Sequence, residues 1–296
     1  MTTTTYTASG PTFSDRIDRH DWSTIDQARY LREYILPLKP VIITGGFDHW
    51  PARKKWCLDF FQKQYGHLPL EIDRRKLSMA TLIEEVKHST PTRPAPYLRN
   101  FLVKRLPKEL QRDIDPLPEC INPNWLNTWL IKLWKDWRFV ELYIGGTGAK
   151  FPFLHYDGSH THAFLMQLEG VKEYVAFPPQ QTSLMYAGDG RFTENASAVD
   201  NIDAPDLARF PRFAEARGVR FKLHPGETLY VPAGWWHTAR ILSPSITVSV
   251  NCANAANWKD FARDVSRNWE GSSVKHTMGS AYLFLAGALA RLEGRS

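Results

Sequence analysis

The sequence predicts a mainly β domain with helical additions, and three observations support this fold class. From residue 139 onward, short apolar runs alternate with turns rich in glycine and proline, a pattern typical of a β-barrel or β-sandwich. Before and after this region, apolar residues recur with helical spacing. The length of 296 residues, of which 43% are hydrophobic, favours one large domain over two equal ones.

The part of the chain before residue 139 is expected to be mainly helical. Residues 1–20 are polar and begin with a threonine tract, which predicts a flexible arm. A β-branched run at 40–44 predicts a strand, and three prolines place a loop at 89–96. Helical spacing predicts helices over 22–36, 55–65, 79–88 and 125–137.

The region after residue 139 supplies the predicted core. Between its strands, residues 186–216 form a long polar segment, and a loop of this length is usually functional or mobile. Helical spacing returns after Asn257, so we divide the chain into an arm (1–20), a folded domain (21–256) and a helical segment (257–296). The apolar runs lie at 139–144, 162–168, 171–177, 219–223, 227–232 and 237–250.

Composition argues against several classes of protein. The 37 Lys and Arg against 31 Asp and Glu give a net charge of +6 without a run of like charges, so nucleic-acid binding is not expected. Cys57, Cys120 and Cys252 form no CxxC pair, which excludes a disulfide framework and favours a reducing compartment. The N-terminus has no signal-peptide pattern, and the apolar stretch 281–289 is too short to cross a bilayer. A cytoplasmic protein is expected.

A metal site is indicated by the triplet His155-Tyr156-Asp157 and by His237. In an extended segment, residues two apart point to the same side, so His155 and Asp157 can reach one ion. His237 follows a predicted strand and a Pro-Ala-Gly turn, which places it at a strand end. Two histidines and one carboxylate are the set that holds Fe(II) and leaves positions open for other ligands.

Other residues near these motifs have supporting roles in this interpretation. Trp235 and Trp236 precede His237 and are expected to shield the site from water. His160, His162 and His224 are further candidate ligands. The first two closely follow residues 155–157, the metal loop, and are expected to support the site without binding the ion.

Two segments resemble the metal motifs of the Jumonji-C oxygenases. Residues 153–179 resemble the first motif and residues 229–251 the second, and a looser similarity extends over 25–255. The similarity is to the cupin-like, small-hydroxylase branch, which includes factor-inhibiting-HIF-like and phosphatidylserine-receptor-like enzymes. The resemblance implies a double-stranded β-helix (jelly-roll, cupin) core that uses Fe(II), O2 and the co-substrate 2-oxoglutarate.

The family pattern also assigns co-substrate residues. It implies that Lys172 pairs with the distal carboxylate of 2-oxoglutarate and that Asn251 lies near the iron and the co-substrate. Relatives carry Thr or Ser three residues before the first ligand, where this chain has Pro152. The missing hydroxyl contact is therefore expected from Tyr143 or Thr161.

The resemblance implies hydroxylation of a C–H bond with release of succinate and CO2. The expected substrate is a peptide or protein side chain, or else an amino-acid-like small molecule. Alternatives are an N-methyl demethylase, a cupin isomerase and a non-catalytic cupin-type binding protein. The intact ligand set argues against the last, and the absence of zinc-finger cysteines favours hydroxylation over demethylation. The apolar tail at 281–292 is expected to form a homodimer contact or to pack on its own domain.

Overall fold

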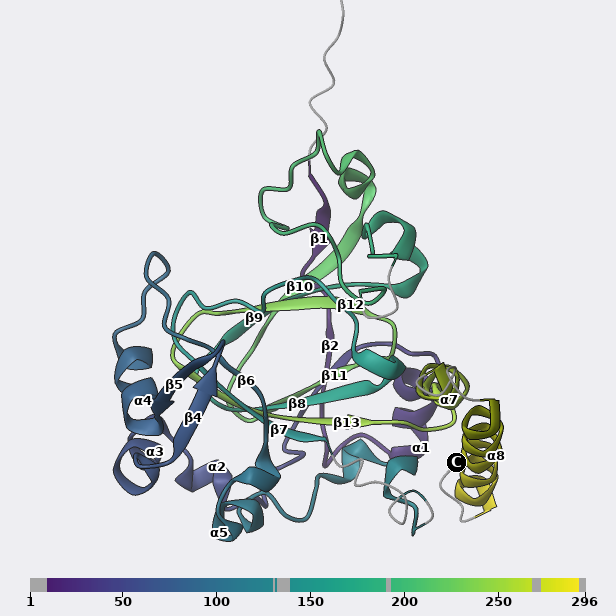
Figure 1. Ribbon diagram of the computed structural model, residues 1–296, viewed down its shortest axis with the longest axis horizontal. Coiled ribbons are helices and arrows are strands. Elements are labelled where there is room, and N and C mark those ends of the chain that lie inside the picture. Colours follow the sequence, from purple (N-terminus) through teal and green to yellow (C-terminus); the bar gives the residue numbers. More distant parts are fainter. Residues whose placement is uncertain (1–9, 130, 132–138, 190–192, 268–272, 293–296) are drawn as a thin grey trace, which may run out of the picture.

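The core consists of two β-sheets that lie one above the other (Figure 1). A computed structural model describes residues 10–129, 131, 139–189, 193–267 and 273–292. Within these residues, the larger sheet contains, in order, β2 (Asp18–Asp21), β3 (Val41–Thr44), β11 (Glu227–Val231), β8 (His162–Glu169), β13 (Ser245–Cys252), β7 (Val140–Gly145) and β6 (Leu98–Leu102). The smaller sheet contains β1 (Thr12–Ser14), β10 (Arg217–Leu223), β9 (Lys172–Phe177) and β12 (Trp236–Ile241).

The predicted mainly β class with a jelly-roll core is confirmed, and β13 shows how the sequence builds it. Ile246, Val248 and Val250 enter the main hydrophobic core on one side of the larger sheet. The alternate residues of β13 are polar, and Ser249 pairs with Glu141 of β7. Because side chains alternate along a strand, the polar set faces the opposite side, the interior between the two sheets.

Helices cover the outer face of the larger sheet and one side of the molecule. The predicted helix at 79–88 forms from Met79, and Ser78 caps it by accepting a hydrogen bond from the Thr81 amide. Helices α3 and α4 lie at one side of the barrel with a small hairpin, opposite to α7 and α8 (Figure 1). Their bounds are α1 (Gln27–Tyr30), α2 (Ala52–Lys55), α3 (Leu58–Tyr65), α4 (Met79–Lys87), α5 (Lys108–Arg112), α7 (Trp258–Arg267) and α8 (Ser273–Leu292), with the hairpin strands β4 (Pro69–Ile72) and β5 (Arg75–Ser78).

Short helical turns complete the path of the chain. A π-helical turn, η1, continues α1, so the helix predicted from residue 22 begins only at Gln27, after the capping residue Asp26. Of the helix predicted over 125–137, residues 125–127 form a 3-10 turn, and residues 130 and 132–138 lie outside the described residues. The turns are η1 (Leu31–Ile35), η2 (Val103–Arg105), η3 (Glu119–Ile121), η4 (Trp125–Asn127), η5 (Gly158–His160), η6 (Pro179–Leu184) and η7 (Pro211–Glu215).

Two expectations are corrected by strand pairing. Of the flexible arm expected over 1–20, residues 1–9 lie outside the described residues, and the rest contains β1 and the start of β2, which pair in parallel with β10 and β3. Phe13 of β1 packs against Phe177, with ring centroids 5.7 Å apart, so a tertiary contact orders this polar segment. The apolar run 237–250 is not one strand, because the chain turns at Ser243-Pro244 and passes from β12 in one sheet to β13 in the other.

The C-terminal helices and the long insertion both pack on the barrel. Leu283 and Ala286 of α8 are buried in a cluster with Trp125 and Trp258, whereas Phe284 remains 75% exposed. Residues 186–216 contain only η7 and short bridges among their described residues, and Phe213 is buried against Phe177. No helix among the described residues has the length and apolar character needed to cross a membrane.

Candidate metal centre

The three predicted ligands lie together at one end of the barrel interior. His155, Asp157 and His237 each offer a ligand atom, and these atoms lie within 4.8 Å of one another. The backbones of His155 and His237 exchange two hydrogen bonds, of 3.0 and 2.6 Å, in an isolated antiparallel bridge. This bridge joins two residues that are 82 positions apart in the sequence, and the centroids of their imidazole rings lie 4.5 Å apart.

Backbone carbonyls set the tautomer of both imidazoles. His155 Nδ1 lies 3.2 Å from the carbonyl oxygen of Phe153, and His237 Nδ1 lies 2.9 Å from that of Trp235. A carbonyl only accepts hydrogen bonds, so each Nδ1 carries the proton. In the neutral form of each ring, the lone pair is then on Nε2, which is the atom that is left to bind a metal.

The electrostatics of the group fit a divalent cation. Burial lowers the pKa of His155 well below its usual value, and the adjacent His237 lowers it further. Burial raises the pKa of Asp157, whose Oδ2 is enclosed, has no hydrogen-bond partner among the described residues and lies 4.0 Å from His237 Nε2. Neutral imidazoles and an enclosed carboxylate oxygen are the groups that a bound metal would satisfy. Two histidines and one carboxylate match the facial set for Fe(II).

Lys172 lies deep in the same interior, and none of the described carboxylates pairs with it. Its side chain is 1% exposed, and Nζ donates a 3.0 Å hydrogen bond to the Tyr97 hydroxyl. Burial lowers the pKa of Lys172 to about 7. The ammonium pairs with no carboxylate among the described residues, and an isolated buried charge is costly, so the position suits an anionic ligand.

Lys172 and the ligand His237 face the same space. Lys172 begins β9, whose Ala176 pairs with His237 of β12. Residues 172, 174 and 176 share one face of β9, because side chains alternate along a strand. The ammonium therefore lies on the face that carries His237, about four residues further along the sheet.

The two predicted hydroxyl donors are already occupied. The Thr161 hydroxyl donates to the Gly158 carbonyl at 3.1 Å and accepts a 2.9 Å hydrogen bond from Asn251 Nδ2. The Tyr143 hydroxyl donates to Glu141 at 2.8 Å. Because a hydroxyl has one proton to donate, neither is free to donate to a carboxylate, and both assignments lose support.

Tyr97 is a candidate that the sequence analysis did not single out. Its hydroxyl accepts from Lys172, and its own proton has no acceptor among the described residues. Tyr97 immediately precedes β6 and is 75 residues before Lys172, so the local sequence around Lys172 gives no sign of this partner. Its hydroxyl can therefore replace the contact that Pro152 cannot make.

Asn251 and Glu141 line the interior between Lys172 and the metal ligands. The Asn251 amide lies beside Asp157 and favours its ionised form, although burial has the larger effect on that carboxyl group. Glu141, which the sequence analysis missed, accepts hydrogen bonds from Tyr143 and from Asn100 Nδ2 at 3.2 Å. Burial raises the pKa of Glu141, so this carboxyl group takes up a proton more readily than an exposed one.

The tryptophans next to His237 do not shield it as expected. Trp236 precedes His237 on β12 and therefore faces the other side, where it is buried and donates to Thr182 at 2.9 Å. Trp235 donates to the Leu38 carbonyl at 2.8 Å. Phe151 instead covers the site, because its ring stacks on His155 at a centroid distance of 4.1 Å and an angle of 15°.

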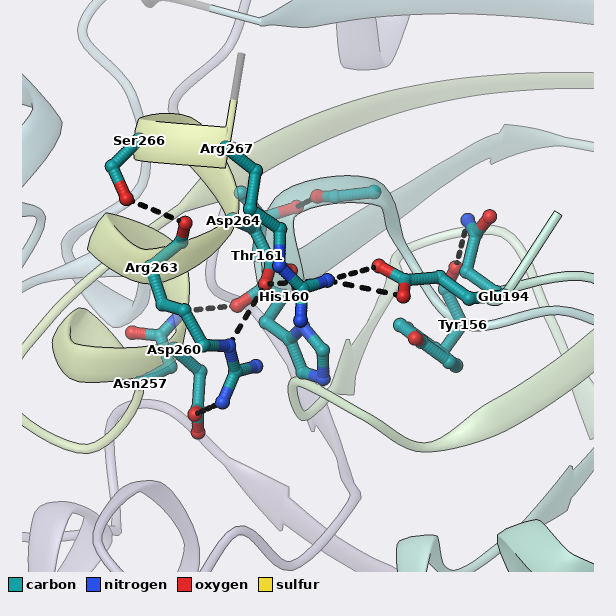
Figure 2. Close-up of polar contacts among 12 residues, drawn as sticks. Tyr156, His160, Thr161, Glu194, Asn257, Asp260, Arg263, Asp264, Ser266 and Arg267 are labelled. Atoms are coloured by element: carbon teal, nitrogen blue, oxygen red, sulfur yellow. Dashed lines mark hydrogen bonds and ion pairs between the residues drawn. The ribbon is translucent and has the colours of Figure 1, made fainter. Parts of the chain in front are cut away.

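The metal loop is held from outside by α7 and by the insertion (Figure 2). His160 Nδ1 lies 2.5 Å from Asp264 of α7, and Asn257 donates to the His160 carbonyl at 2.7 Å. From the insertion, Glu194 accepts from Arg267 of α7 at 2.9 Å, which joins both supports (Figure 2). His160 thus lies near the loop without joining the ligand group, as expected.

The other two candidate histidines, His162 and His224, also lie outside the ligand group. His162 is fully buried, and its Nδ1 accepts a 2.9 Å hydrogen bond from the Ala233 amide. Its Nε2 lies 3.2 Å from Asn254 Oδ1, so both ring nitrogens are used within the fold. His224 is exposed at the end of β10.

Similarity to known proteins agrees with this geometry. A family model described as a cupin-like domain matches residues 27–257. Lysine-specific demethylase 8 of Xenopus tropicalis is 30% identical over 227 residues, which cover 73% of this chain and 48% of the relative. Lysine-specific demethylase JMJ30 of Arabidopsis thaliana is 30% identical over 241 residues, which cover 77% and 53%.

A third relative is named for the chemistry. The 2-oxoglutarate and iron-dependent oxygenase JMJD4 of Gallus gallus is 23% identical over 279 residues, which cover 86% of this chain and 63% of the relative. The chain spans about half the length of the two demethylases it matches. On the family model and the convergence of His155, Asp157 and His237, the chain belongs to the cupin-like Jumonji-C family of iron(II)- and 2-oxoglutarate-dependent oxygenases.

Proposed function

We propose that this oxygenase hydroxylates a C–H bond of a peptide or protein side chain and releases succinate and CO2. One observation carries the proposal: the interior holds a metal-ligand group and, on the same face, the buried Lys172, for which the described part of the chain offers no counterion. A metal site alone would fit many cupins. An added site for an anion is what a co-substrate with two carboxylates requires.

The side chains have distinct roles in this proposal. His155, Asp157 and His237 hold Fe(II), which supplies the redox chemistry with 2-oxoglutarate and O2 when it is bound. Lys172 pairs with the distal carboxylate, and Tyr97 donates its free proton to the same group. Phe151 excludes water from one side of the ligand group.

The runner-up is removal of an N-methyl group, and the relatives' names favour it. Two of them are named lysine-specific demethylases, and another from Arabidopsis thaliana is named an arginine-specific demethylase. Hydroxylation of an N-methyl carbon gives an unstable product that loses formaldehyde, so both functions share the first step. In the chain itself, the absence of zinc-finger cysteines is the feature that favours hydroxylation.

The test is 2-oxoglutarate turnover by the purified protein reconstituted with Fe(II) without oxygen and then exposed to air. We expect succinate release above background, loss of it in Asp157→Ala, and retention in His224→Ala, which removes an exposed histidine outside the ligand group. Absence of any iron-dependent succinate would leave a non-catalytic binding protein. With a peptide substrate, a mass gain of one oxygen indicates hydroxylation, and formaldehyde indicates demethylation.

Association through α8 is also a proposal. Met278, Phe284 and Leu285 are 70%, 75% and 59% exposed on this helix, although its other side is buried. Exposed apolar side chains grouped on one helix suit a second copy of the chain. Light scattering should then give twice the 34.0 kDa chain mass, and Phe284→Glu should return it to one. A single-chain mass for the wild type at every concentration would contradict the dimer.

A further inference from the structure

An open groove lies outside the barrel interior, beside the metal centre. The β4–β5 hairpin, the end of α4 and the loops at 93–97 and 149–152 form its walls. Its volume is about 960 Å³, at the upper end of what small-molecule pockets usually offer. It lies on the side of the barrel where Figure 1 shows α4 and the hairpin, away from α7 and α8.

The groove carries an excess of positive charge. Arg75 binds Glu85 through two hydrogen bonds of 2.8 and 2.5 Å, and Arg99 binds Asp73 at 2.9 Å. Two further cations, Arg93 and Lys150, are exposed and form no salt bridge in the part of the chain that the structure describes, although Lys150 is near enough to Asp203 to help lower the pKa of that carboxyl group. After the pairs within the lining are formed, the lining therefore keeps two positive charges in excess.

The groove connects with both halves of the site. Tyr97 lines it and carries the hydroxyl that accepts from Lys172. The Arg99 guanidinium lies 5.8 Å from the centroid of the Phe151 ring, which stacks on His155. Pro152, also in the lining, is three residues before His155. The groove therefore lies on the far side of the Phe151 ring from the metal ligand His155.

We infer that this groove binds the acidic residues of a polypeptide substrate, next to the residue that is oxidised. The inference rests on the proposed function and narrows its substrate class. An extended peptide can place its carboxylates on Arg93 and Lys150, and the paired Arg75 and Arg99 add to the local potential. Because the groove is open to solvent, it also suits an extended chain better than a small metabolite, which an enclosed pocket would surround.

A nucleic acid fits the groove less well. Asp73 and Glu85 lie in the lining and would face successive phosphates of a bound strand. Strand binding usually combines a continuous basic path with exposed aromatic rings for stacking. Within the described lining, Tyr97 is the aromatic residue, and it is 8% exposed and committed to Lys172.

The experiment measures binding of fluorescein-labelled peptides by anisotropy at low ionic strength. The probes are a peptide of alternating Glu and Ala, a matched Gln peptide and a single-stranded oligonucleotide. We expect the wild type to bind the Glu peptide about tenfold more tightly than the Gln peptide, as two exposed ion pairs allow. The variant Arg93→Glu with Lys150→Glu should lose this preference, and Arg93→Gln with Lys150→Gln should lose most of it.

The control variant is Lys104→Glu with Arg105→Glu. It changes the net charge by the same amount at exposed positions of η2, outside the groove, and we expect it to keep the preference. Equal binding of the Glu and Gln peptides by the wild type, or an equal loss in both charge-reversal variants, would overturn the inference. Tighter binding of the oligonucleotide would reassign the groove to nucleic acid.

The proposed function is judged separately, by peptide-independent succinate release from the wild type. Selective binding of the Glu peptide without succinate would contradict the oxygenase proposal and leave a carboxylate-binding groove. Succinate release without selective binding of the Glu peptide would support the oxygenase proposal and contradict the carboxylate-binding groove.

Discussion

The two sides of the metal loop differ in whether their buried charged groups have partners within the fold. Outside the loop, the Asp264 carboxylate meets the His160 imidazole and the Arg263 guanidinium, at 2.5 and 3.2 Å. Inside the barrel, Lys172 is buried with a tyrosine hydroxyl as its polar partner, and Asp157 Oδ2 has none among the described residues. Charges that are paired within the fold hold it together, whereas charges left unpaired mark where ligands bind.

The pKa shifts follow the same division. Burial opposes ionisation of Asp264, but hydrogen bonds and the charges of His160 and Arg263 lower the pKa of Asp264 below its ordinary value. For Lys172, burial acts alone and lowers the pKa to about 7. The charged form of Asp264 is thus stabilised by its partners within the fold, whereas the charged form of Lys172 would be stabilised by a bound anion.

The largest effect is expected from removing a metal ligand. Asp157→Ala or His237→Ala should reduce Fe(II) affinity and succinate release by ~100-fold or more, beyond the 10–100-fold typical of residues that only support a ligand. The fold should survive, because neither side chain contributes to a hydrophobic cluster. Metal titration and turnover assays check this, with circular dichroism for folding. Wild-type turnover in Asp157→Ala would remove the carboxylate from the proposed ligand set.

The next largest effect is expected from replacing the buried cation Lys172. Lys172→Met should raise the Michaelis constant for 2-oxoglutarate by about 10- to 100-fold, since hydrogen bonds to charged groups contribute about 1.5–3 kcal/mol. Fe(II) affinity should stay within about twofold, because Lys172 lies outside the ligand group. Lys222→Met, on the exposed part of β10, is the matched control and should change neither. An unchanged Michaelis constant in Lys172→Met would exclude the proposed contact.

The same substitution should stabilise the protein without ligands. The pKa of Lys172 is about 7 in the folded protein and about 10.4 in an unfolded chain, so between these values the unfolded state binds more protons. Wild-type stability should therefore rise as pH increases from 7 to 10, and Lys172→Met should flatten this rise. At pH 7 the variant should gain about 1–4 kcal/mol in urea unfolding. A loss of stability would mean that the cation is paired in the free protein.

Binding of 2-oxoglutarate should consequently take up a proton. An anion beside Lys172 raises its pKa, so affinity should be greatest below pH 7 and weaken by up to about tenfold per pH unit above it. Calorimetry in buffers of different ionisation enthalpy measures the uptake directly, with Lys172→Met as the comparison. Equal proton uptake by the two proteins would assign the proton to another group.

The smallest effect is expected from removing the charge of Asp264, which pairs with His160 outside the metal loop. Asp264→Asn keeps the shape of the side chain and removes its charge from His160, so Fe(II) affinity should fall about three- to tenfold, less than the roughly 10–100-fold typical of residues that directly support a ligand. The Michaelis constant for 2-oxoglutarate should not change. Asp260→Asn, which removes an exposed pair with Arg263 on the same helix, is the control and should leave metal affinity intact. A larger loss in the control would contradict the support assigned to His160 and Asp264.

Much of the fold could be predicted because its signals are local. The period-two apolar runs place most strands of the core, and the Pro-Ala-Gly turn before His237 marks the start of β12. The helix over 79–88 has its cap in the adjacent residue Ser78. The pairing of β1 and β2 could not be predicted, because these polar segments are ordered by partners far along the chain.

The amino-acid order alone specifies which residue types are available for chemistry: two histidines and a carboxylate in recognisable motifs, and a lysine that starts an apolar strand. The tertiary structure decided their partners. In the folded chain, the hydroxyl protons of Thr161 and Tyr143 are donated to protein acceptors, whereas that of Tyr97 has no acceptor among the described residues. His160 pairs with Asp264, which is 104 residues away in the sequence. Periodicity is a property of neighbouring residues, but a hydrogen-bond partner depends on which distant strands meet.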